Sequence, residues 1–417
     1  RYFCLEKPDG SLLPQYLSVV NTALDPARIA KGQDRVMRAR LSDAAFFFAE
    51  DKKVDLESRV EKLSGIVFHV RLGTVREKVA RIERLAVLLA KELGASDELA
   101  SKVHLGAHLC KFDLVSLMVG EFPELQGEMG RAYALARGLD AEVAGAVSEH
   151  YKPIGAEGEL PAGLVATCVA LADRLDTLAG CFAVGLEPTG TADPYALRRN
   201  DIAVLRFFLD APQTGGLEKL ASLDLGTLFG LAYDGLTGIK LDLDRDAAVK
   251  KLLGFSYDRL RNLLAQRTSS QAADVALAGA AQEHAAYPAL AAAKAKAIHA
   301  ASGEAWLAKA KLVAKRLAGI SKDAKPVLHP AELFTREEDG RIVRLVHSLD
   351  EGTRALTDAE SVRRGLVSAE HAATELDAIF EGMLVNDPAD PRTKERLELL
   401  SFGASCMLRL GDFTKLG

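Results

Sequence analysis

The chain has 417 residues, enough for two or three domains, and its 48% hydrophobic and 27% charged residues are those of an ordinary folded protein, which excludes global disorder. Its formal net charge of −5 excludes a protein that coats nucleic acid over its whole surface, although this sum averages over local basic patches. Five cysteines without CxxC spacing, four of them in apolar contexts, predict reduced thiols and a cytoplasmic protein.

The first predicted elements are two short strands and a helix. RYFCLE (1–6) and YLSVVN (16–21) are β-prone, and the turn-forming KPDGS lies between them. Because a lone hairpin is barely stable in water, we expect it either to join a larger sheet or to pack on the segment that follows. KGQDRVMRARLSDAAFFF (31–48) then shows helical spacing, with four basic residues in the ten from Lys31 to Arg40.

From about residue 72 the pattern is helical nearly to the end of the chain. In residues 73–90 an apolar stripe recurs at steps of three and four residues: Val75, Val79, Ile82, Ala86 and Leu89. We place the basic side chains of this helix on its other sides: Arg76, Lys78, Arg81 and Arg84. Glycine and proline punctuation divides residues 71–210 into several packed helices. The apolar run 164–186 contains Asp173, Arg174 and Asp176, so it predicts no membrane span.

Two stretches, HLCKFD (108–113) and ALADRLDTLAG (170–180), resemble helices of the HD superfamily of metal phosphohydrolases, whose ion is held by oxygen and imidazole ligands. On that pattern Asp113, His150 and Asp173 take ligand-like positions. However, Phe112 stands where the motif histidine belongs, and no histidine lies between residues 70 and 103. We therefore expect vestigial HD positions and no bound metal.

Other histidines and acids near this pattern have ordinary explanations. His104 and His108 share a helix face and could in principle rescue a metal site, but a pair of ordinary histidines is the expected case. Asp173 and Asp176 are expected to accept hydrogen bonds from neighbouring helix ends or arginines.

Two groups of basic residues lie near the end of the chain. Lys309, Lys311, Lys315 and Arg316 belong to one predicted helix, and Arg392, Lys394 and Arg396 open the last one. Cations at a helix start oppose the helix dipole, so an outside anion such as a phosphate backbone would offset them. The alternative is a solvated face. The chain has no GxxxxGK[ST], GxGxxG or GxSxG motif and no short ATP-binding signature of a synthetase with a dinucleotide-type fold.

Several long motifs occur together in one order: LSDAAFFFAEDKK (41–53), LGTVREKVARIERLA (72–86), KFDLVSLMVGEFPELQGEMG (111–130), EHYKPIGAEGELP (149–161), ALADRLDTLAG (170–180) and PTGTADPYALRRNDIAVLR (188–206). With these motifs the chain resembles the β subunit of bacterial tetrameric glycyl-tRNA synthetase. The likeness extends over essentially all 417 residues and weakens between about 210 and 300. Because β subunits of this family are considerably longer, the resemblance suggests that the chain is the C-terminal portion of one.

The resemblance implies a mainly α fold with four parts. Residues 1–70 would be the remnant of an α/β body domain, and residues 71–210 a degenerate HD-like helical domain. Residues 211–288 would form a helical connector, and residues 289–417 a helical domain of the anticodon-binding type.

The resemblance also implies a function: a cytoplasmic subunit of an aminoacyl-tRNA synthetase that binds glycine tRNA. Its partner would be the α subunit, in an α2β2 heterotetramer. ATP and Mg would be used at the α subunit to make glycyl-adenylate, with no cofactor in this chain. The tRNA-binding residues would be Lys311, Lys315, Arg316, Arg392, Lys394 and Arg396. The alternatives are a divalent-metal phosphohydrolase that uses Asp113, His150 and Asp173, and a purely structural assembly scaffold.

Overall fold

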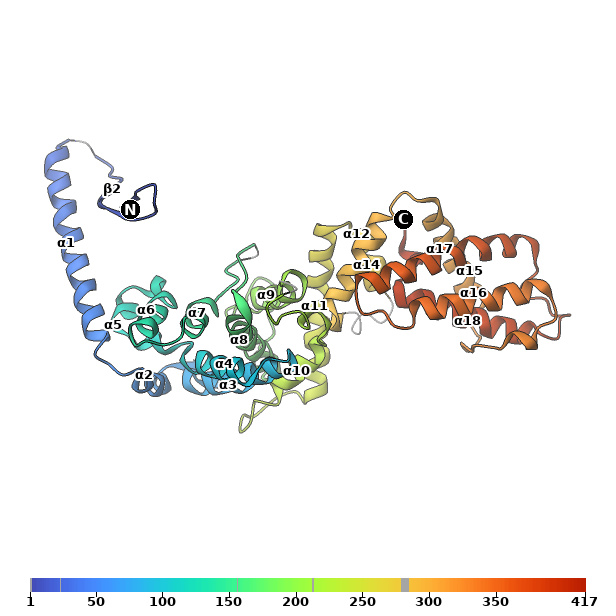
Figure 1. Cartoon of the computed structure of the whole chain (residues 1–417), viewed down its shortest axis with the longest axis horizontal. Coiled ribbons are helices and arrows are strands. Elements are labelled where there is room, and N and C mark those ends of the chain that lie inside the picture. Colours follow the sequence, from blue (N-terminus) through green and yellow to red (C-terminus); the bar gives the residue numbers. More distant parts are fainter. Residues whose placement is uncertain (1, 23, 156, 212–213, 279–284) are drawn as a thin grey trace.

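The structure is a computed structural model that describes residues 2–22, 24–155, 157–211, 214–278 and 285–417. Helices dominate, and the strands of the described residues form two separate two-stranded sheets, which confirms the predicted mainly α class. Figure 1 shows an elongated molecule in which the hairpin lies at one end, a helical bundle in the middle and a second bundle at the other end.

The predicted hairpin is present and packs on the helix that follows it. Strand β1 (Tyr2–Glu6) pairs antiparallel with β2 (Leu12–Ser18), and α1 (Pro26–Asp51) comes next. The side chain of Asp25 caps α1 by accepting a hydrogen bond from the Arg28 backbone, and proline opens its first turn. The Tyr16 hydroxyl donates to Asp34 of α1 at 2.8 Å.

The middle bundle surrounds α8 (Gly163–Ala183), in which almost every residue is buried. Helices α3, α4 and α7 pack against it. The elements of this bundle are α2 (Leu56–Lys62), β3 (Val67–His69), β4 (Gly73–Thr74), α3 (Val75–Glu92), α4 (Asp97–Leu109), η2 (Phe112–Val115), α5 (Leu117–Glu121), α6 (Glu128–Ala136) and α7 (Ala141–Glu149). Thr74 and Glu77 form a capping box that fixes the start of α3, whose predicted apolar stripe is buried throughout.

The second half of the chain adds helices to the same core. They are α9 (Leu197–Asp210), α10 (Leu225–Tyr233), α11 (Arg245–Arg267), α12 (Ser270–Leu277), α14 (Pro288–Ala300), α15 (Ala305–Ile320), α16 (Glu337–Thr353), α17 (Ala359–Gly382) and α18 (Thr393–Leu410). One contiguous cluster of buried apolar residues extends from α3 to α18. The boundaries at residues 210 and 288 therefore stay predictions, because the apolar core continues across both.

Two further expectations are met in the described part of the chain. None of its helices combines the length and the apolar character that crossing a membrane requires. Four of the five cysteines are buried free thiols, and the fifth, Cys4, is exposed.

Candidate functional site

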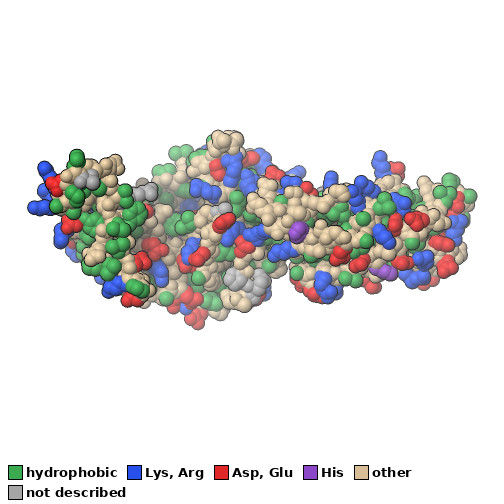
Figure 2. All heavy atoms as spheres, turned by 90° about the horizontal axis from the view of Figure 1, so that it is seen from above, with side chains coloured by type: hydrophobic (Ala, Val, Ile, Leu, Met, Phe, Trp, Pro, Cys, Tyr) green, Lys and Arg blue, Asp and Glu red, His purple; other side chains and the backbone are tan. Residues whose placement is uncertain are grey.

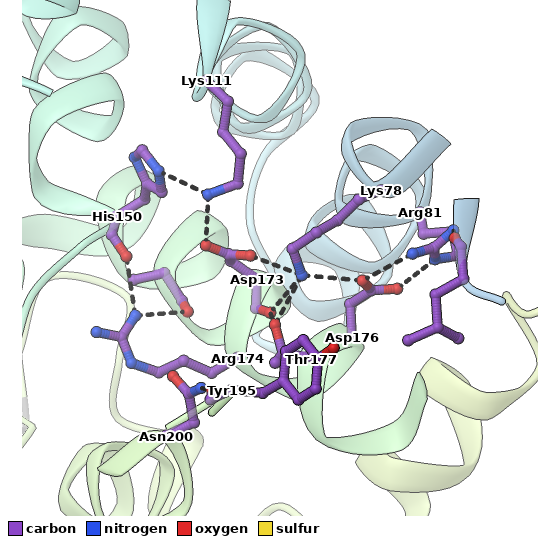
Figure 3. A network of polar contacts seen from close by, with 12 residues as sticks. Lys78, Arg81, Lys111, His150, Asp173, Arg174, Asp176, Thr177, Tyr195 and Asn200 are labelled. Carbon is purple, nitrogen blue, oxygen red and sulfur yellow. Dashed lines mark hydrogen bonds and ion pairs between the residues drawn. The ribbon is translucent and has the colours of Figure 1, made fainter. Parts of the chain in front are cut away.

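Asp173, in the middle of α8, lies between two lysine side chains that come from different segments (Figure 3). Lys78 of α3 places its Nζ 2.9 Å from Oδ1, and Lys111, just after α4, places its Nζ 2.7 Å from Oδ2. All three side chains are largely buried. Burial alone would raise the pKa of Asp173, but the ammonium groups of Lys111 and Lys78 outweigh it and hold that pKa well below its usual range.

One turn further along α8, Asp176 extends the same network. Lys78 Nζ also donates to Asp176 Oδ2 at 3.0 Å, and Arg81 Nε donates to Asp176 Oδ1 at 2.6 Å. The prediction that Asp176 accepts hydrogen bonds from an arginine is thus confirmed. Asp173 accepts from lysines instead. Two carboxylates are held by three cations, and each charge in this interior has a partner of opposite sign.

His150, directly after α7, completes the centre as a hydrogen-bond acceptor. Its Nε2 is 3.1 Å from Lys111 Nζ, and its Nδ1 is 2.8 Å from the Val147 carbonyl oxygen. Because an ammonium group only donates, Nε2 accepts, and the ring proton resides on Nδ1. Burial, followed by the charge of Lys111, lowers the pKa of His150 well below 6.5, so this imidazole is neutral.

The remaining HD-like positions serve the interior of the bundle. Asp113 is fully buried, and its Oδ2 accepts backbone hydrogen bonds from Gly127 at 2.6 Å and Gly130 at 3.1 Å, which fixes the start of α6. Burial raises the pKa of this carboxyl. Phe112, at the place of the motif histidine, is fully buried in an apolar cluster with residues such as Leu109 and Tyr133.

These contacts leave the centre unsuited to a divalent cation. Both oxygens of Asp173 face ammonium groups, and the free lone pair of His150 accepts from Lys111. A metal ion would have to displace two positive charges and then bind with a single carboxylate and one imidazole. Within the described ranges, no three His, Cys, Asp or Glu side chains are grouped so that they could hold a metal ion. The phosphohydrolase alternative therefore finds no support in this centre.

The histidine pair on α4 contacts glutamates. His108 Nδ1 lies 3.0 Å from Glu83 Oε1, and its Nε2 lies 2.7 Å from Glu57 Oε2, so the ring joins α4 to α3 and α2. His104 Nε2 is 3.8 Å from Glu83 Oε2. The hydrogen bond that the imidazole donates to Glu83 raises the pKa of His108. Both histidines thus contact glutamates of neighbouring helices.

The two lysines that define the centre were not predicted from the sequence. The prediction that Lys78 lies on an outward side of α3 is wrong, because this residue is only 3% exposed. A signal was present: Lys78 follows Val75 by three residues and precedes Ile82 by four, so helical spacing puts it on the apolar stripe. Lys111 lies in the HLCKFD stretch (108–113), between the motif-like positions 108, 112 and 113, and no local pattern marks it as buried.

The predicted basic residues of α15 have different surroundings. Lys315 is exposed and Lys311 half-buried, whereas Arg316 pairs with Asp377 of α17 at 3.3 Å. Several lysines in and around α14 and α15 have no ion-pair partner in the part of the chain that the structure describes: Lys296, Lys309, Lys311, Lys315, Lys322 and Lys325. Figure 2 shows basic side chains interspersed with acidic ones along one face of the molecule.

The basic residues at the start of α18 require a correction. Arg396 is fully buried, and its guanidinium donates to Asp339 at 2.5 and 2.9 Å, to Asp390 and to the Val385 carbonyl oxygen at 3.0 Å. The prediction that Arg396 contacts RNA is wrong, because no phosphate can reach this group.

Its two neighbours remain at the surface. Arg392 lies 3.3 Å from Glu395, and Lys394 is 83% exposed, with its Nζ 3.9 Å from Glu398.

The basic residues of α15 and those at the start of α18 lie at different places on the surface. Helices α15 and α18 run antiparallel: the Trp306 ring near the start of α15 contacts Phe413 after α18, and Ser401 of α18 donates to the Ala324 carbonyl oxygen after α15. This arrangement puts the start of α18 toward the end of α15 and puts Lys311 toward the opposite end of the helix pair.

Comparison of the sequence with known proteins identifies related proteins. A sequence model described as glycyl-tRNA synthetase beta subunit matches residues 1–278. The glycine–tRNA ligase beta subunit of Geobacter metallireducens is 38% identical over 417 residues, which are 100% of this chain and 59% of that protein. The protein of the same name from Geobacter sulfurreducens is 39% identical over 388 residues, 92% of this chain and 54% of that protein. The chain thus spans less than two thirds of the length of these relatives.

Proposed function

The chain belongs to the glycyl-tRNA synthetase beta subunit family, and from this premise we propose that it acts as the tRNA-binding part of a glycine–tRNA ligase. The observation that carries the proposal is the similarity to proteins of that name along the whole chain. The proposed partners are glycine tRNA and an α subunit, in an α2β2 assembly in the cytoplasm. On this proposal ATP and Mg are used at the α subunit, which makes the glycyl-adenylate.

The arrangement of the HD-like centre supports a binding role rather than a hydrolytic one. Its charged groups are buried and paired with one another, so they hold α3, α7 and α8 in fixed positions. In the proposed function this rigid bundle, residues 71–210, helps to position the acceptor end of the tRNA. The helices of residues 289–417 form the anticodon-binding part, with Lys311, Lys315, Arg316, Arg392 and Lys394 as the RNA-facing residues.

Aminoacylation tests the proposal directly. Glycine attachment to its tRNA is measured with the α subunit alone and with the α subunit plus the intact protein that contains this sequence. We expect glycyl-tRNA only when both are present. If the α subunit alone charges the tRNA at the same rate, the proposed function is rejected.

The α15 surface gives a test at the level of residues. A Lys311→Ala/Lys315→Ala variant should bind glycine tRNA more weakly, because it loses contacts to phosphates. Each lost phosphate contact should also lower the slope of log affinity against log salt concentration by about one. Binding is measured by fluorescence anisotropy over a range of salt concentrations. The control is Arg363→Ala, an exposed residue whose charge is already balanced by Glu360 at 2.8 Å. Equal slopes for both variants would exclude α15 as an RNA surface.

A further inference from the structure

A row of basic side chains lies on α1, far from the residues assigned above. It consists of Arg28, Lys31, Arg35 and Arg38, and is called here the α1 basic row. Its members follow one another at steps of three, four and three residues, so they share one side of the helix. The hairpin contacts α1 through Gln33 and Asp34, which accept hydrogen bonds from its tyrosine hydroxyls. Helical spacing directs the row away from most of that contact.

The charges of this row are not balanced within the described residues. All four side chains are exposed, and none forms an ion pair, whereas Arg40 of the same helix pairs with Glu121 at 2.8 Å. Like charges three and four residues apart on a helix repel one another. Arg28 also lies in the first turn, where the carboxylate of Asp25 already caps the positive end of the helix dipole. An anion from outside would relieve the repulsion between the four cations.

The side chains between the cations indicate what kind of anion fits. Gly32, Ala39 and Ser42 lie on the same side of α1, and a Cβ added at Gly32 would meet nothing within 4 Å. Small side chains therefore separate the basic groups, and no bulky side chain of the described helix stands between them on this side. The centre of a protein–protein interface is normally depleted of charge, whereas four cations lie along this side of α1. The exposed apolar side chains of the helix, such as Val36 and Phe46, lie beside the row or beyond its end. Ten residues of helix extend over about 15 Å, a length that covers several phosphates of one strand.

We propose that the α1 basic row is a second RNA contact, which binds the phosphate backbone without reading bases. The inference rests on the proposed function, since it assumes that the ligand is glycine tRNA. Helix α1 and helix α15 lie toward opposite ends of the elongated molecule (Figure 1). An RNA that touches both is held at two separated points, and each point adds its own release of counterions to the binding.

The test removes three charges from the row in the intact protein. An Arg28→Gln/Lys31→Gln/Arg35→Gln variant keeps good helix-forming residues at exposed positions, so the fold should be retained. Binding of glycine tRNA is measured between about 50 and 200 mM salt, and the slope of log affinity against log salt should fall by about 2–3. The matched control removes three exposed charges that are already paired with acids: Arg354→Gln/Arg363→Gln/Arg364→Gln.

The outcomes separate this inference from the proposed function. A slope equal to that of the control, while the Lys311→Ala/Lys315→Ala variant still lowers it, overturns the α1 contact and leaves the proposed function standing. A wild-type protein that shows no salt-dependent tRNA binding rejects both. A triple variant that binds tRNA normally but no longer associates with the α subunit overturns the inference in favour of a protein-binding row.

Discussion

Asp201 of α9 is a buried carboxyl that the sequence did not single out. Ser256 Oγ of α11 donates to its Oδ1 at 2.7 Å. Arg259 Nε lies 3.7 Å from Oδ2, too far for a hydrogen bond, and Oδ2 has no other hydrogen-bond partner among the residues described. Burial therefore raises the pKa of Asp201 to about 7, despite the opposing effects of Ser256 and Arg259.

This pKa predicts that the free energy of unfolding depends on pH. The folded state binds the Asp201 proton more tightly than the unfolded chain does, so the contribution is complete below the unfolded pKa and is lost as pH rises toward about 7. Asp201→Asn stays uncharged at every pH. Between pH 5 and 8 the unfolding free energy of the wild type should therefore fall by about 1–3 kcal/mol more than that of Asp201→Asn. Chemical denaturation at several pH values measures it, with the exposed Asp246→Asn as control. Parallel curves for wild type and Asp201→Asn would contradict the prediction.

Single residues also show how far sequence reasoning reaches into the candidate site. Asp113, His150 and Asp173 were found because they fall on the positions of a known motif. Lys78 could have been found from its helical spacing. The role of Arg396 could not, because its partner Asp339 lies 57 residues away and nothing local distinguishes this arginine from its exposed neighbours. Charge pairing across the chain is decided by tertiary packing, which a single sequence does not display.

At the scale of elements, Arg396 connects three segments. Its guanidinium joins the first turns of α18 to Asp339 in the first turn of α16 and to Asp390 in the loop between α17 and α18. Arg396→Ala would leave the buried carboxylate of Asp339 without its partner, whereas Asp390 would keep Arg336 at 2.9 Å. Breaking a buried pair in this way costs about 3–5 kcal/mol. We expect a much lower unfolding free energy by chemical denaturation, whereas the exposed Lys394→Ala should be close to neutral. Equal stability of the two variants would contradict the buried network.

The helices themselves were largely predictable, because their pattern is local. The apolar stripe of α3 repeats at helical spacing, and the Pro-Asp-Gly turn between two β-prone runs predicts the hairpin. The face that α1 turns toward its neighbours was less evident. Its first half contacts the hairpin, and its second half contacts α5 through pairs such as Arg40 and Glu121. Those contacts depend on segments that spacing alone does not bring together.

At the scale of the whole molecule, the four predicted parts stay predictions, and the sequence did not show how the segments of the chain join. The predicted connector, residues 211–288, contributes α12, which packs against α11 and α14 in the contiguous core. The chain after α18 returns to this helix, where the Asp412 backbone donates to the Val275 carbonyl oxygen at 2.9 Å. The C-terminal helices are thus attached to the middle of the molecule by backbone contact as well as by apolar packing.

Gly411, at the end of α18, makes this attachment testable. A Cβ at residue 411 would lie 2.5 Å from the Val275 carbonyl oxygen, and backbone on both sides leaves no flexible group to move aside. Gly411→Ala should therefore lower the unfolding free energy by about 1–3 kcal/mol, as overpacking does. The control is Gly319→Ala in α15, where an added Cβ meets nothing within 4 Å and helix propensity favours alanine. Chemical denaturation compares the two. If Gly411→Ala proves as stable as Gly319→Ala, the close approach of α18 to α12 does not exist in solution, and the two parts of the chain are joined by side-chain packing alone.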